Sequence, residues 1–193
     1  MRTYQGRGNS KHQKKGFTMI ETLVALIIIS VGLLGVAGLV SESQKNVQEV
    51  QQRSIALQLT NDILARMTAN PQGLANYQGN IAAALNQPGT LCNQDNSNCT
   101  PAQLAAYDLW EWSTYLFGSS IQLNNNDAGG LISPTACITV SNDDDVTLVI
   151  AWRGKFQRAD SNAVQTCGTN SPNYNGGNAN DLRRLMIVET TIS

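Results

Sequence analysis

An apolar run near the N-terminus is the strongest feature of the hydrophobic pattern. The 24 residues from Phe17 to Val40 carry one charged side chain, Glu21, and they directly follow Lys14, Lys15 and Gly16. A helix of this length is about 36 Å long, which is enough to cross a hydrocarbon core of roughly 30 Å with some tilt. A carboxylate near the start of such a helix is costly in lipid and therefore marks a partner or a function. We predict a membrane-spanning helix over residues 17–40.

The pattern after this run changes to that of an amphipathic helix. From residue 41 to residue 69 apolar residues recur at spacings of three and four, which bury one face of a helix. The stripe consists of Ala56, Leu59, Ile63 and Met67, with Leu57 and Leu64 beside it. Asn70-Pro71 ends the pattern, because the residue before a proline avoids the helical region and proline lacks a donor. We predict a helical stalk over residues 41–70 that packs on a sheet.

The remaining part, residues 71–193, combines one further helix with several strands. Thr100 and Pro101 have the form of an N-cap and a first-turn proline, so a helix should run to about Phe117. Residues 80–86 are a candidate for a short helix. Residues 136–141, 146–152 and 182–192 are rich in β-branched residues and predict strands. The expected fold class is α+β, a long N-terminal helix packed on an antiparallel sheet.

Three polar segments are expected to form loops. Asn124–Gly130 and Asn170–Asp181 are rich in Asn and Gly, and the second is predicted to be a mobile loop. The acidic segment 142–145 joins two predicted strands. Its aspartates are compatible with calcium, but the EF-hand pattern and its bidentate glutamate are missing, which favours a simple hairpin turn.

Four cysteines, Cys92, Cys99, Cys137 and Cys167, follow the apolar run. An even number in an exported domain indicates disulfides, although four cysteines allow three pairings. We favour Cys92–Cys99 and Cys137–Cys167, which give one local loop and one clasp over a longer segment. A zinc site is the alternative, but the spacing matches no common zinc pattern and no histidine follows.

Charge and composition restrict the function classes. Five of the 13 basic residues lie in residues 1–16, so the rest of the chain has 8 basic against 14 acidic side chains. This balance does not favour a nucleic-acid-binding face. Arg153, Lys155 and Arg158 form a small basic patch, which we interpret as a solvated strand end. His12 is the single histidine, and its position before the apolar run argues against histidine-based catalysis. No cofactor or metal ion is expected, and the chain is not expected to be an enzyme.

The segment Gly16-Phe17-Thr18-Met19-Ile20-Glu21, preceded by lysines and followed by an apolar run, resembles the class III signal of type IV prepilins and pseudopilins. The resemblance implies cleavage by prepilin peptidase between Gly16 and Phe17, followed by N-methylation of Phe17. The residues themselves agree. A secretory signal is cut after its apolar segment, whereas a cut at Gly16 leaves this segment at the new N-terminus. The basic leader, residues 1–16, is expected to be cytoplasmic.

The same resemblance implies a role for Glu21 in assembly. In pilins the equivalent carboxylate meets the N-terminal amine of a neighbouring subunit, an attraction that is strong at low dielectric and draws subunits into register. The alternative is a glutamate that is merely hydrated at the membrane interface.

Two further segments are similar to those of PilV-type minor pilins. One is ARMTANPQGLANY, from Ala65 to Tyr77, and the other runs from Cys99 to Asp108 with Trp112 close behind. The resemblance implies the type IV pilin fold and a minor pilin that promotes pilus assembly, adhesion and twitching motility. Its partners would be the prepilin peptidase, other minor pilins, the major pilin and the inner-membrane assembly platform. The protein would lie in the inner membrane and then in the pilus at the cell surface. Alternatives are a type II secretion pseudopilin and an uncut, membrane-anchored periplasmic binding protein.

Overall fold

The computed structural model describes residues 16–94, 98–124, 126–127, 129–141, 144–160, 162, 164–169 and 171–192. The leader predicted over residues 1–16 therefore lies outside the described residues except for Gly16. Contacts divide the chain into two units, Met1–Gln44 and Lys45–Ser193, and each is described by itself.

One helix, α1 (Met19–Ala69), covers the predicted membrane segment and the predicted stalk. The glycines at 32, 35 and 38 do not interrupt it, although each weakens a helix by about 1 kcal/mol relative to alanine. In the first unit, the large apolar side chains of α1 are all 49% exposed or more. An 18-residue window of α1 has a mean hydropathy of 2.8 and no buried part, so the helix is long and apolar enough to cross a membrane.

The sheet of the second unit is antiparallel, with four strands in the order β1-β4-β5-β6 among the described residues. The strands are β1 (Gly79–Ile81), β4 (Thr135–Val140), β5 (Asp145–Arg153) and β6 (Arg183–Thr191). The three predicted strands thus lie within one residue of their observed bounds at each end. The short helix predicted over residues 80–86 is wrong, because Asn80 and Ile81 pair with Cys137 and Ala136 of β4.

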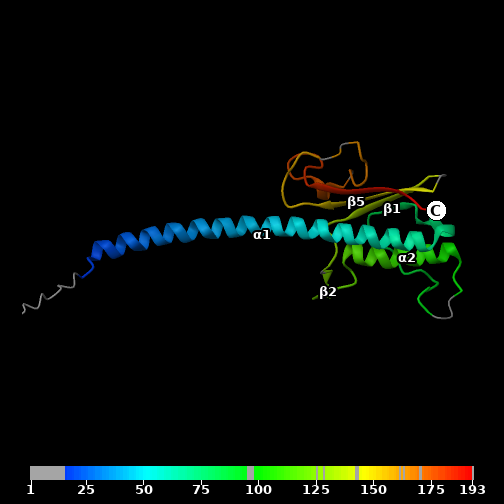
Figure 1. Ribbon diagram of the computed structural model, residues 1–193, viewed down its shortest axis with the longest axis horizontal. Coiled ribbons are helices and arrows are strands. Elements are labelled where there is room, and N and C mark those ends of the chain that lie inside the picture. Colours follow the sequence, from blue (N-terminus) through cyan, green and yellow to red (C-terminus); the bar gives the residue numbers. More distant parts are fainter. Residues whose placement is uncertain are drawn as a thin grey trace, which may run out of the picture. The chain divides into compact units, whose positions relative to one another are not determined.

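The helical layer contains α1, η1 (Pro71–Tyr77) and α2 (Pro101–Phe117). Thr100 caps α2 as predicted, and it forms a complete capping box with Gln103. Gly118 then ends the helix with a φ of 76°. A two-stranded hairpin, β2 (Gln122–Leu123) with β3 (Asn126–Asp127), follows. Figure 1 shows α2 running alongside the end of α1 on one side of the sheet.

The core of the second unit lies between α1, α2 and one face of the sheet. The predicted stripe of α1 is buried as expected, and Trp112 of α2 donates a 2.9 Å hydrogen bond to the carbonyl of Leu59. Leu148 and Ile150 of β5 face this layer. Leu57 does not join it, because it points away from the stripe and remains 49% exposed.

The opposite face of the sheet is covered by the described residues between 154 and 182, which include η2 (Pro172–Tyr174). Figure 1 shows this loop on the side of the sheet away from the helices. Val149 and Ala151 are buried beneath it, and Tyr174 is fully buried. The expectation of a merely mobile loop over Asn170–Asp181 is therefore corrected, since Tyr174 fixes this segment to the sheet. Of the predicted acidic turn, residues 142 and 143 lie outside the described residues.

Candidate functional site

The predicted processing site precedes the first turn of α1. Gly16, Phe17 and Thr18 are not helical, and the side chain of Phe17 is 83% exposed. No atom outside its chain neighbours lies within 4 Å of the position that a Cβ on Gly16 would occupy. The bond between Gly16 and Phe17 is therefore an exposed, non-helical peptide bond, which is the form that a peptidase requires.

Thr18 sets the start of α1 immediately after this bond. Its side-chain oxygen accepts a 3.4 Å hydrogen bond from the backbone amide of Glu21, as an N-cap residue does. Glu21 consequently lies in the first turn, where a carboxylate interacts favourably with the helix dipole. The structure thus brings Gly16, Phe17 and Glu21 together within one turn of the helix start.

A charged cluster joins α1 to α2 in the second unit. Arg66 binds three carboxylates, those of Asp62 at 3.2 Å, Asp108 at 3.2 Å and Glu111 at 2.7 Å. Burial alone would lower the pKa of Arg66, but Glu111 and Asp62 outweigh it and raise the pKa overall. The guanidinium therefore stays charged and holds the two helices together.

Tyr77 and Asn70 complete this junction. The buried hydroxyl of Tyr77 donates to Asp108 and accepts from the side-chain amide of Asn70, which also donates to the Pro101 carbonyl at 2.8 Å. Burial, with Asp108 as the second cause, raises the pKa of Tyr77, so its hydroxyl stays protonated. A Cβ on Gly73 would lie 2.4 Å from the amide nitrogen of Asn70. The Arg-Met and Asn-Pro-x-Gly residues of the pilin-like segment are thus the parts of a helix junction.

Glu49 of α1 connects the helix to the opposite end of the sheet. Its carboxylate accepts a hydrogen bond from the Lys155 backbone amide at 2.9 Å and pairs with Arg184 of β6. Burial would raise the pKa of Glu49, but these two contacts and the Arg158 charge lower it overall. One residue of the stalk therefore holds two segments that are more than 100 positions away in sequence.

Arg183 organises the loop that covers the sheet. Its side chain is fully buried, pairs with Asp160 at 2.6 Å and donates to the backbone carbonyls of Asn162, Gln165 and Cys167. Its Nε atom has no partner among the described residues. The sequence analysis missed this residue. Its one available signal was its place in the alternation of β6, on the face of Leu185 and Ile187.

The cysteines pair as the sequence analysis favoured. Cys92 is bonded to Cys99 and Cys137 to Cys167, and no described cysteine is free. The second bond attaches the covering loop to β4 next to the segment that Arg183 holds. Across the described ranges, no three His, Cys, Asp or Glu side chains are grouped so that they could hold a metal ion.

Comparisons with known proteins agree with the N-terminal motif and the junction. Residues 39–110 match the family described as Type IV pilin Tt1218, and residues 11–37 match the prokaryotic N-terminal methylation motif. The chain therefore carries a methylation motif followed by a type IV pilin segment, and the predicted resemblance is confirmed. The α+β fold class is confirmed by the same match together with the observed helix and sheet.

A stretch of 66 residues is 33% identical to Type II secretion system protein I of Vibrio cholerae serotype O1 (strain ATCC 39315 / El Tor Inaba N16961). The match covers 34% of this chain and 56% of that protein, so the chain spans about half the length of the curated relative it matches. No solved structure matches.

Proposed function

We propose that this chain is a minor pilin of a type IV pilus. In this proposal prepilin peptidase cuts between Gly16 and Phe17, Phe17 is N-methylated, and residues 17–40 hold the protein in the inner membrane. The protein is then incorporated into the pilus or its initiating tip complex, where it promotes assembly, adhesion and twitching motility. Its work is assembly without bond-making, and the peptidase, the assembly ATPase, the inner-membrane platform and the other pilins are its partners.

One observation carries the proposal. An exposed Gly16–Phe17 bond immediately precedes a helix whose first turn holds Glu21 and whose apolar side chains are unburied. Exposed apolar area of this size requires lipid or other subunits to cover it. In this proposal lipid covers the apolar side chains of residues 17–40 before assembly, and the helices of neighbouring subunits cover them afterwards. A carboxylate in the first turn then meets the amine that cleavage creates on a neighbouring chain.

The decisive test is the mass and N-terminal sequence of the protein recovered from sheared pili. We expect a chain that begins with methyl-Phe17. A functional protein that keeps residues 1–16 would contradict the proposal and would favour an uncut membrane anchor.

A type II secretion pseudopilin is the second candidate function, and the partial match to protein I of the Vibrio cholerae secretion system favours it. Both candidates require the same processing, so an N-terminal sequence does not separate them. Deletion of the gene does. Loss of surface pili with normal secretion of exoenzymes supports the pilus, and the reverse result supports secretion.

A further inference from the structure

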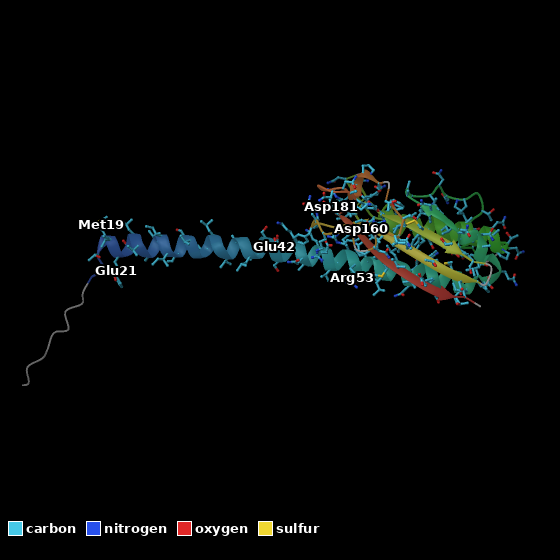
Figure 2. The ribbon with its side chains drawn as sticks, turned by 90° about the horizontal axis from the view of Figure 1, so that it is seen from above. Met19, Glu21, Glu42, Arg53, Asp160 and Asp181 are labelled. Carbon is cyan, nitrogen blue, oxygen red and sulfur yellow. A yellow bond between two sulfur atoms is a disulfide. The ribbon has the colours of Figure 1, made fainter. Side chains whose placement is uncertain are left out.

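Basic side chains are concentrated at one end of the second unit. Of the eight Lys and Arg residues after residue 16, all of which the structure describes, only Arg66 lies outside this end. The other seven lie on residues 45–53 of α1, at the end of β5, at the start of β6, or in the loop between these strands. They are Lys45, Arg53, Arg153, Lys155, Arg158, Arg183 and Arg184. Figure 2 labels Arg53 and the loop residues Asp160 and Asp181 at this end.

The contacts described above fix these segments to one another. Glu49 accepts from Lys155 and pairs with Arg184, and β5 and β6 are in register at Arg153 and Arg183. Arg153 and Lys155 also line one shallow pocket of about 160 Å³. The segments that carry these cations therefore lie side by side, although they come from three separate stretches of sequence.

Most carboxylates at this end are already neutralised. Glu49 and Asp160 pair with Arg184 and Arg183, and Asp181 accepts hydrogen bonds from three backbone amides, those of Gly176, Gly177 and Asn178. These hydrogen bonds, above all the one from Asn178, lower the pKa of Asp181. The charge of the Asp181 carboxylate is therefore stabilised by backbone amides of its own loop.

Five of these cations are exposed; Lys45 is one, and we call the other four the basic end. They are Arg53, Arg153, Lys155 and Arg158. Two further exposed carboxylates among the described residues are Glu42 of α1, three positions before Lys45, and Asp127 of β3. The other end of the sheet is acidic, because Asp144, Asp145 and Glu189 lie where β5 begins and β6 finishes. The unit is therefore electrically polarised along its strands.

The chain connection limits how far the basic end can lie from the predicted membrane segment, because Glu49, which binds Lys155 and Arg184, follows that segment closely in sequence. Glu49 is nine positions after Val40 in α1, which corresponds to a rise of about 14 Å. The headgroup layer occupies roughly the first 5–7 Å outside the hydrocarbon. The remaining distance is comparable to the Debye length, about 8 Å at physiological salt. Lys and Arg side chains this close to an anionic surface are attracted to it.

We propose that the basic end docks on anionic phospholipid headgroups while residues 17–40 span the membrane. This inference rests on the proposed function for the membrane span but not on assembly. The short chain connection favours lipid over a soluble partner, because it limits how far these four cations can move from the headgroups while residues 17–40 span the membrane. Docking of this kind orients the domain before it leaves the membrane.

The test uses Lys155 as a reporter, since it is the one lysine of the basic end. The full chain is placed, one copy per disc, in lipid nanodiscs of phosphatidylcholine or of phosphatidylcholine with 30% phosphatidylglycerol. Acetylation of Lys155 by an N-hydroxysuccinimide ester is followed by mass spectrometry. A surface potential of about −30 mV raises the local proton activity about threefold, so we expect acetylation about threefold slower in the anionic discs. Salt at 0.5 M should abolish the difference.

Two variants complete the design. The R153Q/R158Q variant removes two cations but keeps Lys155, and in anionic discs it should be acetylated at the rate seen in phosphatidylcholine. The D144N/D145N variant changes the acidic end and should remain as slow in anionic discs as the wild type. Equal rates in both lipids, or slowing that persists in R153Q/R158Q, would overturn the proposal. Slowing that requires two copies per disc would overturn it in favour of contact with the acidic end of another copy.

Deuterium exchange of residues 17–40 separates this proposal from the function on which it rests. Protection of that segment in both lipids, combined with equal Lys155 rates, overturns only the docking. Absence of protection overturns the membrane span as well.

Discussion

The Tyr77 hydroxyl donates a hydrogen bond to the Oδ2 atom of Asp108, and this bond joins η1 to α2 directly after α1 ends. Both residues are buried, so water cannot replace either partner. The position of α2 on the stalk therefore depends on a polar contact as well as on the apolar stripe.

Substitution Tyr77→Phe should destabilise the second unit by about 1–2 kcal/mol, because it leaves a buried carboxylate oxygen without its donor. The measurement is the urea midpoint of the full chain in detergent, followed by tryptophan fluorescence. Tyr115→Phe is the matched control, since Tyr115 is 44% exposed, and it should leave the midpoint unchanged. Equal midpoints for the two variants would contradict the role of this hydrogen bond.

The long helices and the three long strands of this fold were predictable from sequence, whereas the short strands β1, β2 and β3 and the long-range polar contacts were not. The spacing of the stalk stripe and the β-branched runs predicted α1, β4, β5 and β6, because periodicity depends on neighbours within a few residues. The side chains of Asp108 and Glu111 are an example. Their actual partner, Arg66, is 42 and 45 positions away in sequence, and nothing in local spacing identifies it.

Composition alone also misjudged the covering loop. Its Asn and Gly content predicted mobility, but Pro172 and Tyr174 lie within it, and the burial of one aromatic ring is enough to fix the segment. The tyrosine hydroxyl donates to the Ser133 carbonyl at 2.8 Å. An aromatic residue inside a polar stretch was therefore the signal that could have corrected the prediction.

Substitution Glu49→Gln should lower stability by about 1–2 kcal/mol at pH 7, because it removes a charge-assisted pair with Arg184. The pKa of Glu49 is depressed in the folded state from an ordinary value of 4.5. Its contribution is therefore complete above the unfolded pKa and is lost as pH falls through the folded pKa. Urea midpoints of wild type and variant should differ at pH 7 and converge as the pH falls below 4.5 and through the folded pKa. The exposed Glu189→Gln is the control, and a constant difference at all pH values would refute the assignment.

Substitution Arg183→Lys should destabilise the covering loop by about 3 kcal/mol, since one ammonium cannot reach all the acceptors that the guanidinium holds. Limited proteolysis should cut between residues 155 and 166 faster than in the wild type. Arg158→Lys is the exposed control and should change the midpoint by less than about 0.5 kcal/mol. Unchanged proteolysis of the Arg183→Lys protein would show that the Cys137–Cys167 bond and the buried Tyr174 hold the loop without the Arg183 contacts.

Substitution Gly73→Ala should cost about 1–3 kcal/mol, because the new methyl group meets the Asn70 amide and the Pro101 carbonyl at 2.4 and 2.6 Å. Gly79→Ala provides the control, since no atom lies within 4 Å of a Cβ there. The comparison of urea midpoints tests whether the lack of space for a side chain at Gly73 is specific to the helix junction. Similar losses for both variants would point to a general backbone effect of removing glycine.

Substitution Glu21→Ala should leave processing largely intact and reduce incorporation into pili. The Gly16–Phe17 bond lies outside the helix. Among the described residues, neither Gly16 nor Phe17 forms a hydrogen bond with the Glu21 side chain, so the peptidase should still cut the bond. In the filament the carboxylate would lack its attraction for the amine of a neighbouring Phe17, and that attraction is strongest at low dielectric. Glu21→Asp keeps the charge on a shorter side chain and should retain more incorporation than Glu21→Ala, which separates loss of charge from loss of the side chain. Immunoblots of the membrane and sheared-pilus fractions, with the processed length checked by mass, give both quantities. If Glu21→Ala entered pili at the wild-type level, the carboxylate would be a hydrated interfacial residue, and subunit register would have to come from the apolar packing of α1 alone.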